Sequence, residues 1–375
     1  MTILTIPTPD PMPLPAPLWL LHTLLLLVLF LHLLAMNCAL GGGLTVFLNA
    51  LRGRSERHPF SRQLATELAP MLPIFVAFTI TLGVAALLFV QVIYGNLLYT
   101  SSILLGAAWM SVILLVIVGY YGYYYFSHHA EKSPRSAVAV LAVAVLCFLC
   151  IAFVLVNNMS LMLTPNRWQQ MYRAHPGGFN LNFGEPTLVS RYLHMLIGAI
   201  GVFTAVLAHL GVRKMRTQPE YGAWLVRRSS VIFALTTGIQ FITGTWFVMA
   251  MPRDIAMSLF REPLPGIVFG VSVILSLVAM VLLLIGSTAV KPGPLVHAGF
   301  LCALLTLALM VGLRHMVRTA YLAPHFDPVT LPVNSQTGVI LLFFVSFVAG
   351  LATVGYMVAK VARASVTAAR AAGAD

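Results

Sequence analysis

The chain has 375 residues, of which 59% are hydrophobic and only 9% are Asp, Glu, Lys or Arg. Because soluble domains carry roughly 25% charged residues, this composition excludes an ordinary soluble globule and a disordered chain. The net charge of +12 does not indicate nucleic-acid binding, since Lys and Arg gather in the cytoplasmic loops of membrane proteins. The four cysteines lie in apolar segments and form neither a disulfide framework nor a covalent haem-attachment motif. We therefore expect a polytopic membrane protein in contact with the lipid bilayer.

Nine apolar stretches are long enough to cross a membrane, because a helix needs about 20 residues to span a hydrocarbon core of roughly 30 Å. They predict an all-α membrane bundle of about nine transmembrane helices that forms one integral membrane domain over residues 1–375. Within it, 1–16 is a Pro-rich outer segment and 361–375 is a cytoplasmic tail. The predicted spans are 17–51, 70–95, 101–127, 136–163, 190–212, 229–251, 265–290, 295–316 and 337–360.

Basic residues predict the orientation, since they accumulate on the cytoplasmic side of a membrane. With alternating spans, 15 of the 22 Lys and Arg residues fall on one side. We therefore expect the N-terminus outside, the C-terminus in the cytoplasm and the chain in a bacterial inner membrane. The longer outward loops are then 164–189, 252–264 and 317–336.

All ten acidic residues fall in loops, at helix ends or in tails. Proton pumps and ion-coupled transporters usually place carboxylates inside the bundle, so their absence argues against transport. It also argues against chemistry that brings protons to a deeply buried site through carboxylates.

Histidine is the functional side chain that does enter the spans. Counting 1.5 Å per helical residue brings three imidazoles to a similar depth near the outer face, and His22 is a further candidate in the first span. Neutral imidazole binds haem iron, and facing helices of a bundle commonly supply such ligands. The alternative is a histidine that bonds a backbone carbonyl or lies at the membrane interface. The three outer candidates are His32, His194 and His315.

Three arginines lie at the same predicted depth: Arg191, Arg314 and Arg318. They are candidates for binding haem propionates through charge-assisted hydrogen bonds, the alternative being ordinary interfacial anchoring. Toward the inner side, a second haem is a weaker hypothesis, with interface-seeking histidines as its alternative. The inner candidates are His209, His297, His128 and His129. The Gly41–Gly43 run lies inside an apolar helix and predicts close helix packing, not a phosphate loop.

Several of these positions resemble subunit I of the cytochrome bd quinol oxidases, over about residues 25–250. The resemblance implies that His194 is the axial ligand of a low-spin haem b and that His32 stands where the family has its high-spin-haem histidine. The matching positions are His32 followed by Gly41, the segment Leu155-Val156-Asn157-Asn158-Met159, Glu185-Pro186, Arg191-Tyr192-Leu193-His194 and the helix end at Gly211.

The chain also departs from that family. Its third span lacks the buried glutamates of the oxygen-reducing site, and the quinol-binding loop is reduced to about 252–264. The GRQPW motif is absent, with His315 and Arg318 standing roughly in its place. No outer methionine completes the His194 haem, since Met280 lies deep in the seventh span. These departures argue against oxygen reduction and against the family's usual quinol site.

The sequence therefore predicts a membrane subunit with one or more b-type haems, part of a quinol- or quinone-linked oxidoreductase complex. It would exchange electrons between the quinone pool and an extracytoplasmic redox protein such as a c-type cytochrome, with a second membrane subunit as a further partner. One alternative is a divergent quinol oxidase that reduces oxygen. Another is a haem-free anchor of a redox complex, and a transporter is the weakest.

Overall fold

The computed structural model describes residues 12–131 and 134–371, and the regular secondary structure in these ranges is helical. Nine of the described helices are long and apolar enough to cross a membrane, which confirms the all-α membrane bundle. The outermost residues of the predicted terminal segments, 1–11 and 372–375, lie outside the described residues. The nine helices are α1 (Leu18–Arg52), α3 (Met71–Leu105), α4 (Ala107–His129), α5 (Pro134–Met162), α7 (Thr187–Lys214), α8 (Pro219–Ala250), α10 (Pro263–Gly286), α11 (Gly293–Leu322) and α12 (Thr337–Ala371).

The second span is longer than the sequence predicts. The polar stretch 96–102 is typical of a loop, yet α3 continues through it to Leu105 with a kink at Tyr94. Its hydroxyl groups are satisfied locally, since Ser101 Oγ donates to the Leu98 carbonyl at 2.9 Å. The helix ends at Gly106, whose φ of 52° is a left-handed conformation that glycine adopts readily.

The connecting loops contain more helix than expected. α8 begins at Pro219, about ten residues before the predicted span, so that two arginines assigned to a loop lie within its first turns. Proline favours the first turn of a helix because its missing N–H would have no partner there. Short helices also form in three loops: α2 (Pro59–Leu68), α6 (Trp168–Ala174) and α9 (Arg253–Arg261).

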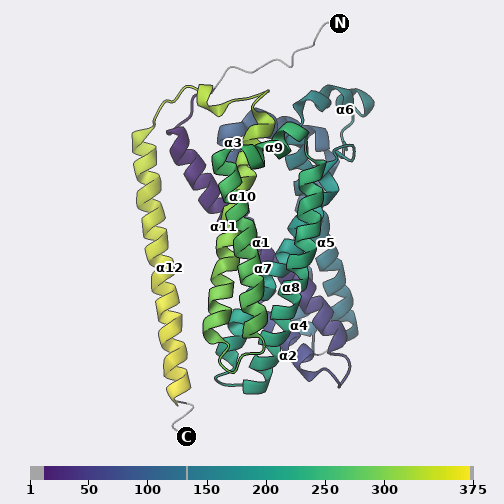
Figure 1. The fold of residues 1–375 in the computed structure, drawn as a ribbon, viewed down its shortest axis with the longest axis vertical. Helices are drawn as coiled ribbons and strands as arrows, with labels where there is room; N and C mark the ends of the chain where they lie inside the picture. The colour runs from purple at the N-terminus through teal and green to yellow at the C-terminus, as the bar shows by residue number, and fades with distance from the viewer. Residues whose placement is uncertain (1–11, 132–133, 372–375) are drawn as a thin grey trace, which may run out of the picture. The chain divides into compact units, whose positions relative to one another are not determined.

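The chain forms two compact units, and the larger one comprises residues 23–327. Within it, α4 pairs with α5, α7 with α8, and α10 with α11, while α5 also packs on α7. Figure 1 shows the long helices of this unit side by side, with α6 and α9 at one end and α2 at the other. The two predicted outward loops 164–189 and 252–264 therefore share one end, opposite the first basic loop.

The glycine run in α1 is a close-packing site, as predicted. A Cβ at Gly41 would collide with the backbone of Ala199 in α7, and one at Gly43 would collide with the Tyr123 hydroxyl of α4. That hydroxyl donates to the Ala39 carbonyl at 3.1 Å. Glycine here allows α1 to approach two neighbours at backbone distance.

The smaller unit comprises the two terminal segments, up to His22 and from Pro328, as far as they are described. Leu14 donates its N–H to the Pro332 carbonyl at 2.7 Å and accepts from Asn334 at 2.9 Å. These bonds join the segment before α1 to the segment before α12.

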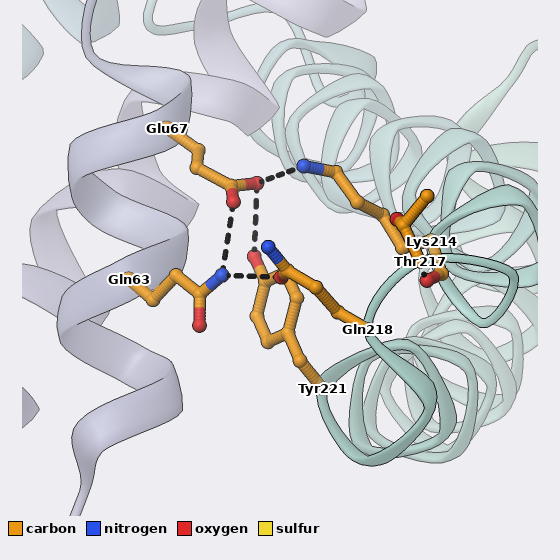
Figure 2. A network of polar contacts seen from close by, with 6 residues as sticks. All are labelled: Gln63, Glu67, Lys214, Thr217, Gln218 and Tyr221. Carbon is orange, nitrogen blue, oxygen red and sulfur yellow. Dashed lines mark hydrogen bonds and ion pairs between the residues drawn. The ribbon is translucent and has the colours of Figure 1, made fainter. Parts of the chain in front are cut away.

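A polar network joins α2 to the ends of α7 and α8 (Figure 2). Lys214 Nζ lies 3.0 Å from Glu67 Oε2, and Tyr221 donates its hydroxyl to the same oxygen at 3.3 Å. Gln63 donates its side-chain amide to Glu67 Oε1 at 3.0 Å and to Gln218 at 2.7 Å. The carboxylate therefore receives three donors, which fastens α2 to the bundle.

Candidate functional site

His194 lies seven residues into α7, with its imidazole against α8. Its Nδ1 is 3.3 Å from Thr243 Oγ1. That hydroxyl already donates its single proton toward carbonyls of its own helix, at 3.1 Å to Ile239. A hydroxyl that donates in this direction is an acceptor for His194, and we infer from this arrangement that Nδ1 carries the proton and that Nε2 keeps its lone pair. This is the tautomer that a metal-ligating histidine requires.

His32 shows the same arrangement on another helix. Its Nδ1 lies 3.0 Å from the Thr79 carbonyl oxygen of α3. A carbonyl only accepts, so Nδ1 is again the protonated nitrogen and Nε2 carries the lone pair. His32 lies 20 residues before Arg52, the last residue of α1, or about 30 Å along the helix.

Both imidazoles rest on glycines. A Cβ at Gly244 of α8 would lie 3.1 Å from Cε1 of His194, and a Cβ at Gly83 of α3 would lie 2.7 Å from Cε1 of His32. Any larger residue would push the ring away. The two glycines therefore fix where each imidazole lies, on the side that carries Nδ1.

At His315 the hydrogen bond to Nδ1 runs in the opposite direction. Arg318 Nη2, which can only donate, lies 2.6 Å from His315 Nδ1. In a neutral imidazole the proton is then on Nε2, where it blocks the lone pair. Binding iron through Nε2 requires the proton to move to Nδ1 and the contact with Arg318 to break.

The three predicted arginines lie together around α7 and α11. The positive charges of Arg191 and Arg318 both act on Arg314, which makes no hydrogen bond, ion pair or cation–π contact within the described residues. Its side chain keeps exposed surface although it belongs to a membrane-spanning helix. The Glu185 carboxylate acts on Arg191, and the excess of positive charge that remains favours an anionic ligand.

The guanidinium groups of Arg191 and Arg318 have contacts with the protein, but not at all of their nitrogen atoms. Arg191 lies 5.0 Å from the centre of the Phe247 ring and donates to Thr187 Oγ1 at 3.3 Å. Arg318 lies 4.5 Å from the centre of the Tyr94 ring. The Nε atoms of both arginines are buried without a hydrogen-bond partner. The cluster thus retains donors for a carboxylate, which suits a haem propionate.

The inner histidines separate into two groups. His209 and His297 lie in contact, with their Nδ1 atoms 3.0 Å apart and their ring centres at 4.6 Å. An iron atom between them would require the rings to move apart. His128 and His129 bond carbonyls four residues earlier in α4 and stack on tyrosines of their own helix.

His22 lies in α1, ten residues before His32, and its side chain has an interaction of its own. No three His, Cys, Asp or Glu side chains come together as metal ligands within the described residues. This observation does not bear on haem, which takes one or two protein ligands.

Sequence reasoning identified the imidazoles and arginines but not the residues that position them. Thr243 and Gly244 lie in α8, 49 and 50 positions after His194, and Thr79 and Gly83 lie about as far from His32. Threonine and glycine are common in transmembrane helices, so the residue type alone does not identify these positions as part of a site. A search for small or hydroxyl residues opposite a histidine on the neighbouring helix could have found them only once the pairing of helices was known.

Comparisons with known proteins support the fold. No protein-family model and no curated protein matches the chain. A solved structure of bd oxidase from Geobacillus thermodenitrificans matches with a TM-score of 0.74 and 14% sequence identity, covering 92% of this chain and 98% of that one. The remote resemblance to cytochrome bd oxidase is therefore confirmed as a likeness of fold, and the chain is an integral membrane protein.

Proposed function

We propose that this chain is a b-type haem membrane subunit that exchanges electrons between the quinone pool and an extracytoplasmic redox protein. The observation that carries the proposal is the contact between His194 Nδ1 and Thr243 Oγ1, at 3.3 Å. With the Thr243 hydroxyl donating to its own helix, this contact would hold the imidazole proton on Nδ1 and leave on Nε2 the lone pair that haem iron takes up. His32 repeats this geometry, and the likeness to bd oxidase supplies a fold consistent with it.

The arginine cluster supplies the second half of the site. Haem carries two propionates, and Arg314 lies in a span without any polar partner among the described residues. A guanidinium in a membrane-spanning helix gains from a bidentate carboxylate, whose geometry its planar donors match. Arg314 would therefore bind a propionate, with Arg191 and Arg318 adding donors through their unpartnered Nε atoms.

Haem supplies one-electron chemistry when bound, and the protein sets its ligands, its dielectric surroundings and its access to water. The residues found here bind and orient such a group. They supply no carboxylate inside the membrane. Among the described residues of the nine membrane-spanning helices, the acidic one is Glu220, and it lies in the first turn of α8. We therefore propose electron transfer without appreciable oxygen reduction.

The end that carries α6 and α9 is our candidate for docking the redox partner. Outside the spans, Tyr172, Phe179 and Phe260 expose more than half of their surface. Exposed aromatic residues are enriched where proteins bind one another. A c-type cytochrome and a second membrane subunit remain the proposed protein partners, and a bacterial inner membrane the proposed location.

The direct test is a reduced-minus-oxidised optical spectrum of the purified chain, together with a haem b count after extraction. We expect a b-type spectrum and at least one haem per chain. His194→Ala should remove one haem equivalent, while His175→Ala, which removes an exposed imidazole from the loop 164–189, should leave the content unchanged. Purified, folded chain without haem would contradict the proposal and favour the haem-free anchor.

The same preparation separates the electron-transfer subunit from the oxidase. We expect reduced chain to be reoxidised slowly by air and quickly by an added c-type cytochrome. Rapid quinol-dependent oxygen consumption that requires His32 would favour a divergent quinol oxidase instead.

A further inference from the structure

A basic depression lies at the opposite end of the bundle from α6 and α9. It has a volume of about 550 Å³ and is bounded by the end of α1, the start of α2 and the third turn of α8. Three guanidinium groups and one imidazole line it, and no carboxylate does. The three arginines are Arg52, Arg57 and Arg228, and the imidazole is that of His58. A cavity of this composition attracts an anion.

Among the residues that line the depression, Arg228 has a buried donor that the protein leaves without an acceptor. Its guanidinium lies 5.7 Å from the centre of the Trp224 ring, which also lines the depression. Its Nε is buried without a hydrogen-bond partner. By contrast, the nearby Arg62 is used in the fold, since its Nε donates to the Gly53 carbonyl at 3.0 Å.

Two carboxylates lie close in the sequence, Glu56 and Glu67, but among the described residues neither lines the depression or forms an ion pair with its arginines. Glu67 is the acidic residue of α2, and its oxygens accept from Lys214, Gln63 and Tyr221 (Figure 2). The start of α2 adds to the positive field, because His58 gives it no side-chain cap and the N-terminal end of a helix dipole is positive. The depression therefore combines side-chain charge with a helix N-terminus.

The surfaces beside the depression are apolar and exposed. Leu48 and Leu51 precede Arg52 on α1, and both are exposed. On α8, Val231 and Leu235 are exposed and stand three and seven residues after Arg228, on the same face of the helix. A ligand bound here would meet cations at one end and lipid-facing hydrocarbon at the other.

We propose that this depression binds the phosphate of an anionic phospholipid of the phosphatidylglycerol type, with its acyl chains along α1 and α8. A free phosphate would use the cations but not the apolar surface. The distribution of Lys and Arg predicts that this end is on the cytoplasmic side, where anionic lipid headgroups attract basic residues. The proposal does not depend on haem binding.

The test measures phosphatidylglycerol binding to the full chain in detergent, by native mass spectrometry and by lipid-induced thermal stabilisation. Arg228→Gln should weaken binding about tenfold, the loss expected for one charge-assisted contact. Arg227→Gln is the matched control, because Arg227 is the exposed neighbour that does not line the depression. It should bind like the unchanged chain, and haem content should be the same in all three.

Equal losses in Arg228→Gln and Arg227→Gln would overturn the proposal, because they would show unspecific attraction. Equal protection by inorganic phosphate would overturn it as well, by showing a free-anion site. Should Arg228→Gln fail to fold, Arg57→Gln with Arg54→Gln as its control provides the same comparison in the loop before α2.

Discussion

Thr243 Oγ1 lies 3.3 Å from Nδ1 of His194 and is itself a donor to its own helix. With the hydroxyl proton directed toward its own helix, we infer that the Thr243 oxygen accepts from His194 Nδ1. A neutral imidazole in this place presents Nε2 as a base. A contact of this kind suits the axial ligand that we propose His194 to be, because a hydrogen bond behind a ligating histidine fixes both its tautomer and its ring orientation.

We predict that Thr243→Val lowers haem affinity about 10- to 100-fold, the usual effect of losing a partner behind a ligating histidine. The valine has nearly the same shape but cannot accept from Nδ1. The ligand becomes a weaker base, so the midpoint potential should rise. Thr243→Ser keeps the acceptor and is the control. Potentiometric titration and haem retention on dilution measure both effects, and equal behaviour of the two variants would remove Thr243 from the site.

We predict that Gly244→Val abolishes or strongly disturbs the haem bound by His194. Even a Cβ there lies 3.1 Å from the imidazole, so the larger side chain displaces the ring. Gly238→Val is the matched control in the same helix, since a Cβ at Gly238 meets nothing within 4 Å. Haem per chain and the reduced spectrum are the measurements. Loss of haem in both variants, or in neither, would contradict a specific role for Gly244.

The bundle was predictable because a bilayer imposes a length and an apolar composition that the sequence displays directly. His32 and His194 could be selected as candidates from the sequence because polar side chains are conspicuous in such spans. The tautomers were not, since they depend on Thr79 and Thr243 in neighbouring helices. The sequence also could not predict that His315 Nδ1 accepts a hydrogen bond. That contact depends on where the three-dimensional structure places the guanidinium of Arg318.

We propose His315 as the second axial ligand of the haem bound by His194, with His32 or Met316 as alternatives, on the condition that iron binding releases Arg318. We predict that His315→Ala converts low-spin haem to a high-spin or methionine-ligated form, visible in the near-infrared and by electron paramagnetic resonance. Arg318→Gln should keep the low-spin signal, since it removes the contact that competes with ligation. An unchanged spectrum for His315→Ala would move the assignment to Met316 or His32.

The Glu67–Lys214 pair should contribute little to stability by itself. The two side chains are 32% and 39% exposed, and ion pairs of this kind are worth about 0.2–1 kcal/mol. A double-mutant cycle with Glu67→Gln and Lys214→Gln, followed by thermal unfolding in detergent, should show a coupling below ~1 kcal/mol. Glu67→Ala should lower stability further than the pair alone predicts, because Gln63 and Tyr221 also lose their acceptor. A coupling of several kcal/mol would contradict this prediction, because it would mean that water screens the ion pair less than the exposed fractions of the two side chains indicate.

Arg314 provides the sharpest electrostatic test. Within the described residues it has no polar partner, and the charges of Arg191 and Arg318 act on it. Without a ligand, removing this charge should therefore relieve repulsion, so Arg314→Gln should raise the thermal stability of haem-free chain.

With haem bound, the sign reverses. A cation beside the haem favours the reduced form, which has one positive charge fewer, so Arg314→Gln should lower the midpoint potential by about 60 mV, equivalent to a tenfold change in the one-electron equilibrium. Arg261→Gln, which removes an exposed charge at the end of α9, is the control and should leave the potential unchanged. The two measurements together distinguish a haem-binding arginine from an interfacial anchor. If Arg314 only anchors the helix at the interface, Arg314→Gln should lower the stability of both haem-free and haem-bound chain and leave the midpoint potential unchanged.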